Sequence, residues 1–583
     1  MKIINTMKTA AIKPVMLAAM ALLWTARTAL ATATPPADMT VELEVPRIDQ
    51  IETLGLGITE TLSNAPIVTN QPFLEIPFVV FNVPTVASQV MDVRAQDDRG
   101  TLPLRSIDIG SADKRIRRWM ATRAVQGSVV LQYRAPIAKQ FAPRGAAPPL
   151  ELRMQDGGVS GSGATFLLRP ITGKFTYHVR WRVPPGANAI STLDGLNSNA
   201  LSADTLSSTY FAAGLVHVIP DRMNRLFRGA WVGNPSFSAE PLLRWAGQLY
   251  NHYEGLFSAE NTGYTVFMRP NPVNPNGGYG LHRAFIVTFG SNAPGEAEFL
   301  KSTLAHEMFH TFQPQMWKPS AADGSLDVAW FDEGLAVFYQ NALPYRYGMM
   351  SDEEFLRGVN QSAAVYYANP FIDLPNADIP GRFWSDTRVR LIPYERGFVY
   401  FSIVDAALRK VSGGRSSLDD IVLELRRAQN NGQELTPTVW SDALRAPLGE
   451  RGQTAFQEML AGHEMVPDSD VFGPCFQRVR KFARRYELGF DPKVLTEQPR
   501  IVRGILPDSE AARSGLRNGD EIVDPVSQDA IQMDQTATLK LNIMRGAARI
   551  PITYLPRGER VSVWQWERKA SARSGEDCRL PGR

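Results

Sequence analysis

Hydrophobic and polar positions divide the chain into a strand-rich first part and a helix-rich second part. Between about residues 39 and 221, β-branched and aromatic residues occur in short runs that are separated by turn-forming residues, which predicts strands. The strongest strand signals are residues 76–81, 128–133 and 176–181. The glycine-rich stretch 156–163 fits neither a phosphate-binding loop nor a nucleophile elbow, so it predicts a turn before a further strand at 164–168.

The second part starts with a change of hydrophobic period. Helical spacing over residues 238–257 is followed by strand-like runs at 264–268 and 284–289. Residues 350–470 are predicted to be mostly helical, and short strands and turns return from 481 to 568.

One helix after residue 290 carries a strong signal. Leu300, Leu304 and Met308 recur every four residues and predict a buried face. Asn292 is expected to cap this helix, and Pro294 suits its first turn.

The length and composition indicate an ordinary globular protein. The chain has 583 residues, of which 44% are hydrophobic and 21% are charged, so we expect three to five domains. Without the four basic residues of the first 31 positions, 58 basic and 59 acidic residues remain. This balance, without basic runs, argues against nucleic acid as a partner.

The first 31 residues predict a secretory signal peptide. Lysines precede a short apolar stretch from Pro14 to Trp24, and Ala29-Leu30-Ala31 suits a cleavage site. The alternative, a membrane anchor, needs about 20 apolar residues. We therefore expect a periplasmic or secreted protein without a membrane anchor. In an oxidising compartment Cys475 and Cys578 can form one disulfide, the alternative being two unpaired thiols.

The predicted helix contains the sequence His306-Glu307-Met308-Phe309-His310. Residues four apart on a helix point the same way, so the two imidazoles can hold one Zn²⁺ ion while Glu307 takes a proton from water. Glu333 follows His310 after 22 intervening residues and is the expected third ligand, with Asp332 as the alternative. Two histidines and one glutamate leave a coordination position open, as a catalytic zinc site requires.

These residues resemble a known group of enzymes. His306 to His310, followed by Trp330 to Ala336, is similar to the gluzincin metallopeptidases, which include thermolysin and the zinc aminopeptidases. Pro393-Tyr394-Glu395-Arg396-Gly397 resembles the tyrosine motif of those aminopeptidases. The resemblance implies that the Tyr394 hydroxyl stabilises the oxyanion; the alternative is an aromatic side chain that only packs in a helix.

The C-terminal part resembles a bacterial PDZ domain. Glu487-Leu488-Gly489-Phe490 is similar to a carboxylate-binding loop, and the segments 504–512 and 514–522 resemble the PDZ core. Together with the zinc motif, this arrangement resembles the glycyl aminopeptidase family. The resemblance implies a multidomain α+β protein with a signal peptide (1–31), a β-rich N-terminal domain (35–230), a thermolysin-like catalytic domain (231–370) with a helical continuation (371–475), and a PDZ domain (484–568).

The sequence departs from that family at the substrate-binding strand. The family places a glutamate in a glycine-rich strand beside the zinc, where it holds the α-amino group of the substrate. The corresponding stretch here is Gly277-Gly278-Tyr279-Gly280-Leu281-His282-Arg283, which has no carboxylate and adds a permanent positive charge at Arg283. Asp332 or Glu395 could substitute for the missing acid.

The leading hypothesis is an exported zinc peptidase that acts as an aminopeptidase on peptide substrates. A zinc endopeptidase without amine anchoring is a second hypothesis. A third is a non-catalytic protein whose PDZ domain binds peptide tails.

Overall fold

The computed structural model describes most of the chain. The predicted signal peptide, Asn292, Pro294 and His282 lie outside the described residues. The described ranges are 37–90, 93–111, 114–139, 148–194, 201–220, 226–257, 263–272, 275–281, 283–290, 295–316, 326–524, 526, 528–572 and 578–579.

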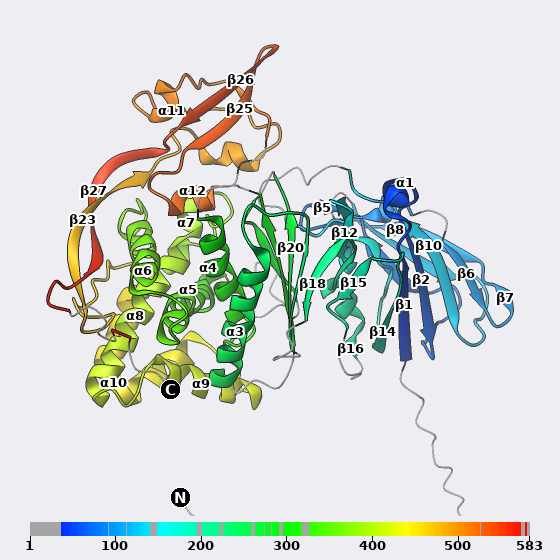
Figure 1. Cartoon of the computed structure of the whole chain (residues 1–583), viewed down its shortest axis with the longest axis horizontal. Coiled ribbons are helices and arrows are strands. Elements are labelled where there is room, and N and C mark those ends of the chain that lie inside the picture. The colour runs from blue at the N-terminus through cyan, green and yellow to red at the C-terminus, as the bar shows by residue number, and fades with distance from the viewer. Residues whose placement is uncertain are drawn as a thin grey trace, which may run out of the picture.

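The N-terminal region consists of β-sheets, as the strand pattern predicted (Figure 1). A seven-stranded sheet has the order β16-β14-β1-β2-β10-β6-β7, and β1 runs parallel to β14 and antiparallel to β2. Two four-stranded sheets, β13-β3-β9-β8 and β11-β12-β17-β15, pack with it around one hydrophobic core. The elements are β1 (Ala37–Glu44), α1 (Ile51–Leu54), β2 (Leu56–Ser63), β3 (Pro72–Pro77), β4 (Val79–Val80), β5 (Val83–Pro84), β6 (Arg94–Asp97), β7 (Gly100–Thr101), β8 (Leu104–Ile109), β9 (Ile116–Ala121), β10 (Val129–Ala135), β11 (Arg153–Gln155), β12 (Gly158–Ser162), α2 (Gly163–Phe166), β13 (Arg169–Pro170), β14 (Lys174–Arg182), β15 (Asn188–Ser191), β16 (Leu201–Ser202) and β17 (Tyr210–Gly214).

Three local predictions in this region were wrong in whole or in part. The strand predicted at 164–168 is instead the short helix α2, because the Ser162 side chain accepts the backbone N–H of Ala164 and starts a helical turn. Residues 158–162, predicted as part of a turn, form strand β12. The run 76–81 is also interrupted: β3 ends at Pro77, and Phe81 lies in the turn of the hairpin β4–β5.

The five-stranded sheet of the predicted catalytic domain, called the catalytic sheet below, has the order β18-β19-β20-β22-β21 and starts earlier than expected. The predicted boundary at 230/231 cuts through β19, whose residues pair with β20 in the same sheet, so the correct division lies near residue 215. Side chains of β20 and β22 alternate between two cores, one shared with helices α3 and α4 and one shared with the N-terminal region. The elements are β18 (Val216–Pro220), β19 (Phe227–Val232), α3 (Ala239–Phe257), β20 (Tyr264–Pro270), β21 (Gly278–Leu281), β22 (Ala284–Phe289) and α4 (Glu296–Phe309).

Helices dominate residues 329–460, so the predicted helical stretch of 350–470 is confirmed except for its last ten residues (Figure 1). Aromatic side chains from α5, α8 and α10, including Trp330, Phe401 and Trp440, form a buried cluster between them. The helices are α5 (Ala329–Arg346), α6 (Asp352–Tyr367), α7 (Thr387–Arg390), α8 (Ile392–Ser412), α9 (Leu418–Asn430) and α10 (Pro437–Leu460).

The C-terminal part forms a separate unit above the helices (Figure 1). A long two-stranded ribbon of β23 and β27 connects the two, and Cys475 and Cys578 form a disulfide with Cα atoms 5.4 Å apart at its base. The unit has its own hydrophobic core, and the PDZ assignment of residues 484–568 stays a prediction. Its elements are β23 (Phe476–Tyr486), α11 (Glu510–Arg513), β24 (Glu521–Ile522), α12 (Asp529–Met533), β25 (Leu539–Arg545), β26 (Ala548–Tyr554) and β27 (Arg557–Arg568).

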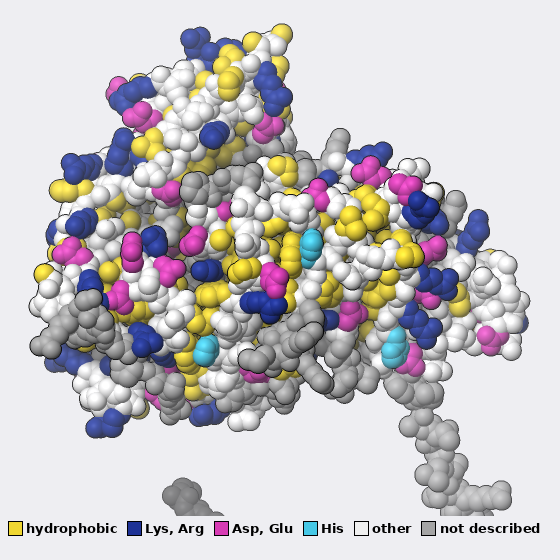
Figure 2. Space-filling view, in the orientation of Figure 1, with side chains coloured by type: hydrophobic (Ala, Val, Ile, Leu, Met, Phe, Trp, Pro, Cys, Tyr) yellow, Lys and Arg dark blue, Asp and Glu magenta, His cyan; other side chains and the backbone are white. Residues whose placement is uncertain are grey.

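The surface carries no single dominant sign of charge on the face drawn in Figure 2, where basic and acidic side chains are interspersed. Among the described residues, no helix combines the length and the apolar character that a membrane span requires.

Candidate metal centre

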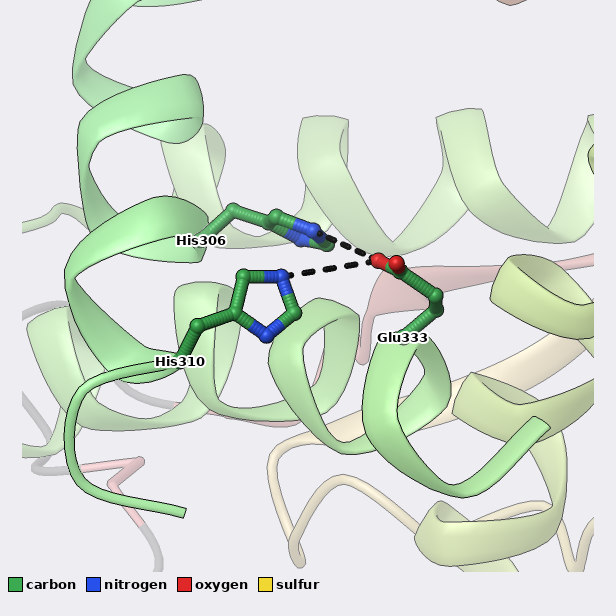
Figure 3. A group of neighbouring side chains, drawn as sticks. All are labelled: His306, His310 and Glu333. Carbon is green, nitrogen blue, oxygen red and sulfur yellow. Dashed lines mark hydrogen bonds and ion pairs between the residues drawn. The ribbon is translucent and has the colours of Figure 1, made fainter. Parts of the chain in front are cut away.

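Helix α4 presents the two predicted histidines on one face. Leu300, Leu304 and Met308 are fully buried, as their spacing predicted, and they fix which side of the helix is turned away from the core. Gly295, and not Asn292, is the N-cap residue of the helix, and no side chain caps it. Figure 3 shows His306 and His310 projecting from this helix toward Glu333 of helix α5.

The three side chains converge on one point. Glu333 Oε2 lies 3.1 Å from His306 Nε2 and 3.5 Å from His310 Nε2. Ligand atoms about 2.0–2.1 Å from a tetrahedral Zn²⁺ ion are separated by about 3.3 Å, so these separations suit zinc without rearrangement. Within the described residues, these three form a group that could hold a metal ion, with ligand atoms within 4.8 Å of one another.

The electrostatics of the group favour a cation. Burial raises the pKa of Glu333, but the charge of His310 and hydrogen bonds from both imidazoles outweigh it, so this pKa lies well below its ordinary value. Burial lowers the pKa of His310, and the Glu333 carboxylate reverses the effect and raises it to about 9. Glu333 is therefore an anionic ligand between two imidazoles.

Two glutamines contact the imidazoles, and the sequence analysis missed both. His306 Nδ1 donates to Gln340 Oε1 at 2.9 Å, and Gln340 Nε2 donates to Ser302 Oγ at 3.1 Å. Because Nδ1 keeps its proton in this hydrogen bond, His306 Nε2, which lies against Glu333, is the nitrogen that would bind a metal. Gln313 Nε2 lies 3.0 Å from His310 Nδ1. The spacing in the sequence could have indicated both residues. Gln340 lies two helical turns after Glu333, and Gln313 lies one turn after His310.

Glu307 lies between the metal ligands and the edge of the sheet. A Cβ atom built on Gly280 of β21 would lie 3.8 Å from Glu307 Oε2, so the glycine leaves open space in front of this carboxylate. Burial raises the pKa of Glu307, although the charges of His306 and His310 act in the opposite direction. A carboxylate with a raised pKa is a better proton acceptor, which suits a general base.

Tyr394 packs against the metal site from helix α8. Its ring is nearly parallel to that of His306, with centroids 6.0 Å apart and an interplanar angle of 15°. Burial raises the pKa of Tyr394 well above its ordinary value, and the charge of Glu333 adds to the shift. The hydroxyl therefore keeps its proton and can donate a hydrogen bond at neutral pH.

A glycine pair brings Tyr394 and Glu333 together. Gly334 of α5 and Gly397 of α8 face each other so closely that a Cβ on Gly397 would lie 2.4 Å from the Trp330 carbonyl oxygen and 2.6 Å from the Gly334 Cα atom. The backbones of the two helices touch at this crossing. A glycine inside a helix often marks such a packing constraint, and this signal was available in the sequence.

The two candidate substitutes for the missing acid lie in different surroundings. Glu395 is 3% exposed and hydrogen-bonds Ser362, which is 2% exposed, so it faces the buried interface with α6. Asp332 accepts the backbone N–H of Met316, and burial raises its pKa to about 7. Glu333, not Asp332, lies within hydrogen-bonding distance of a histidine Nε2. The described part of the edge strand, residues 275–281, contains no carboxylate.

Comparisons with known proteins agree with this geometry. A family model described as M61 glycyl aminopeptidase matches residues 299–373, which include His306, His310 and Glu333 and end before Tyr394. The match confirms the prediction of a peptidase at the level of the enzyme class. A comparison with curated proteins gave no match.

The fold is similar to that of aminopeptidases. A protein of the aminopeptidase N family from Idiomarina loihiensis shares 13% identity over 90% of this chain and 97% of its own, with a TM-score of 0.59. An M1 zinc metallopeptidase from Deinococcus radiodurans, solved with a Tyr-Ser-Ala substrate, shares 15% identity over 74% of this chain and 96% of its own, with a TM-score of 0.41. At 13% identity the likeness to the first of these structures describes the fold and not the roles of single residues.

Proposed function

We propose that this chain is an exported zinc peptidase that hydrolyses peptide bonds and acts as an aminopeptidase. The observation that carries the proposal is the convergence of His306, His310 and Glu333 beside Glu307, at the open edge of the catalytic sheet. The predicted signal peptide supports export, and so does the disulfide between Cys475 and Cys578, because disulfides persist mainly in oxidising compartments.

His306, His310 and Glu333 would hold one Zn²⁺ ion, which supplies Lewis acidity that activates water and polarises the peptide carbonyl group. Glu307 accepts the proton of the attacking water and passes it to the leaving nitrogen. The Tyr394 hydroxyl donates a hydrogen bond to the carbonyl oxygen as negative charge develops there. Gln340 accepts a hydrogen bond from His306 Nδ1 and so holds this imidazole with Nε2 toward the metal site.

The edge strand β21 is the proposed substrate-binding element. It pairs with β22 on one side, and among the described strands it has no partner on the other. An extended peptide can add to this edge as a further strand along Gly278, Tyr279 and Gly280, with backbone hydrogen bonds to every second residue. Gly277 is held at the start of the strand by hydrogen bonds with Thr288.

Replacing Glu307 by Gln tests the catalytic assignment. The amide keeps the size of the side chain but cannot accept a proton, so we expect the variant to retain stoichiometric zinc and to lose peptide hydrolysis. Zinc content by elemental analysis and turnover of a peptide library by mass spectrometry measure the two effects. Hydrolysis at the wild-type rate would contradict the mechanism, and wild-type protein that binds no zinc would contradict the metal site.

The endopeptidase is the second candidate function. It is favoured by one observation, the lack of a carboxylate in the described edge strand, because a buried ammonium group next to Zn²⁺ needs a compensating negative charge. Matched peptides with free and acetylated N-termini separate the two. A preference for the free amine of about a hundredfold, or roughly 2.7 kcal/mol, indicates an aminopeptidase. Comparable rates indicate an endopeptidase.

The C-terminal unit is proposed to be a PDZ domain that binds the extended tail of a substrate or partner peptide. Three contacts join this unit to the helix that precedes Tyr394. Arg390 Nη2 lies 2.5 Å from Asp529 Oδ1, Thr387 Oγ1 donates to the same oxygen at 2.6 Å, and Gln532 Nε2 donates to Thr387 Oγ1 at 2.6 Å. The unit is therefore attached next to the proposed active site.

A further inference from the structure

A rigid hairpin of the N-terminal region presents an exposed phenylalanine to the catalytic sheet. Strands β4 and β5 pair around a two-residue turn, Phe81-Asn82. The base of the hairpin is fixed because Thr85 donates its backbone N–H to Phe78 at 3.0 Å and its hydroxyl to Pro77. Val83 is fully buried, whereas Phe81 at the tip is 60% exposed. Figure 1 shows β5 on the side of the N-terminal region that faces the catalytic sheet.

Phe81, at the tip of the hairpin, is not a residue type that favours the backbone conformation of this turn. Phe81 has φ 48° and Asn82 has φ 66°, which matches a hairpin turn with two left-handed residues. Asparagine and glycine tolerate this conformation, but a bulky aromatic residue is strained there. Phe81 therefore occupies a position where asparagine would fit the backbone better. Such an outlier motivates a hypothesis of function.

Phe81 contacts the proposed substrate strand across the domain boundary. Its ring lies 5.4 Å from the ring of Tyr279, measured between centroids. Tyr279 also packs with Val80, Val83 and Leu150 of the N-terminal region. Because Tyr279 is next to Gly280, the aromatic pair lies one residue along β21 from the glycine that faces Glu307.

Successive side chains of a β-strand point to opposite faces, and this decides which substrate side chains would contact the aromatic pair. Gly280 faces Glu307, and Gly278 faces the ring of Phe285, which belongs to the core shared with α4. Tyr279 points to the opposite face, with Ile286 directly across the ladder. A peptide added to the outer edge of β21 alternates in the same way, so every second side chain would point toward Phe81 and Tyr279.

We propose that Phe81 and Tyr279 form an aromatic platform that binds an apolar side chain of the substrate and determines specificity. This inference rests on the proposed peptidase function, because it assumes that the peptide lies along β21. The ligand class is a peptide with a large apolar or aromatic residue next to the cleaved bond. Aromatic side chains bind such groups by burial of area and by ring contacts.

The substitution Phe81→Asn separates the binding role from a structural one. Asparagine suits the left-handed turn, so the thermal midpoint should stay the same or rise. The assay uses a panel of peptides in which each of the first three positions is varied in turn. In the variant, the ratio of kcat/KM for peptides with Phe or Leu to that for matched peptides with Gly should fall about tenfold or more. Phe81→Tyr, which keeps the ring, should restore the preference. Phe482→Ala is the matched control, since Phe482 is 64% exposed on β23, and its profile should equal that of the wild type.

A binding measurement keeps this inference distinct from the proposed function. Calorimetry measures the affinity of Phe- and Gly-containing peptides for two zinc-loaded proteins, Glu307→Gln and the double variant Glu307→Gln/Phe81→Asn. The double variant should bind the Phe-containing peptide about tenfold more weakly. This loss supports the platform even if the wild type hydrolyses no peptide, in which case only the peptidase proposal fails. An unchanged preference in both turnover and binding overturns the platform.

Discussion

The crossing of α5 and α8 allows a sharp test of how the fold positions the site. In Gly397→Ala the new methyl group would lie 2.4 Å from the Trp330 carbonyl oxygen and 2.6 Å from the Gly334 Cα atom. Ordinary contacts between such atoms are about 3.5 Å, so the two helices must separate by about 1 Å. Overpacking of this kind costs about 1–3 kcal/mol of stability.

The same displacement should affect turnover. Glu333 directly precedes Gly334, and Tyr394 lies one helical turn before Gly397, so separating the helices moves the proposed oxyanion donor away from the metal ligands. A misplacement of about 1 Å can cost about 10²-fold in rate. We expect kcat to fall by about that factor, with zinc content retained because His306, His310 and Glu333 do not lie on α8.

The assay combines kcat per zinc-loaded molecule with the thermal midpoint. Gly255→Ala is the matched control: Gly255 lies in helix α3 with no atom within 4 Å of a built Cβ. Alanine there should stabilise the helix by about 0.5–1 kcal/mol and leave turnover unchanged. Wild-type kcat and an unchanged thermal midpoint in Gly397→Ala would refute the argument. A lower midpoint with unchanged kcat would show that the crossing contributes stability without positioning Tyr394.

Two further predictions follow from buried polar groups. Gln340→Met removes the acceptor for His306 Nδ1 and should weaken zinc binding about 10–100-fold, measured by competition with a chelator; unchanged affinity would show that Gln340 does not orient the ligand. Glu60 is fully buried, and burial raises its pKa to about 8, against 4.5 for the ordinary group. In the folded protein Glu60 therefore keeps a proton that it releases in the unfolded chain. As the pH rises from about 4.5 to about 8, the free energy of unfolding should fall by about 5 kcal/mol in total. Glu60→Gln should remove this part of the pH dependence of unfolding, and an identical dependence in the variant would contradict a neutral Glu60.

The sequence by itself determined the features that depend on neighbouring residues. His306 and His310 share a face because they are four residues apart on a helix, and Leu300, Leu304 and Met308 fix which face is buried. The strand 284–289 was predicted with the bounds that the structure has. These outcomes follow from local periodicity, which any window of the chain contains.

Only the tertiary structure decided how distant segments meet. The sequence predicted a strand at 164–168, but Ser162 starts helix α2 there, because a capping hydrogen bond outweighs a short apolar run. Neither the contact of Phe81 with Tyr279 nor the touching backbones of Gly334 and Gly397 has a periodic signal. Such contacts depend on how helices and sheets pack against one another. The position of Tyr394 beside His306 is therefore a property of the helix crossing and not of the motif that contains it.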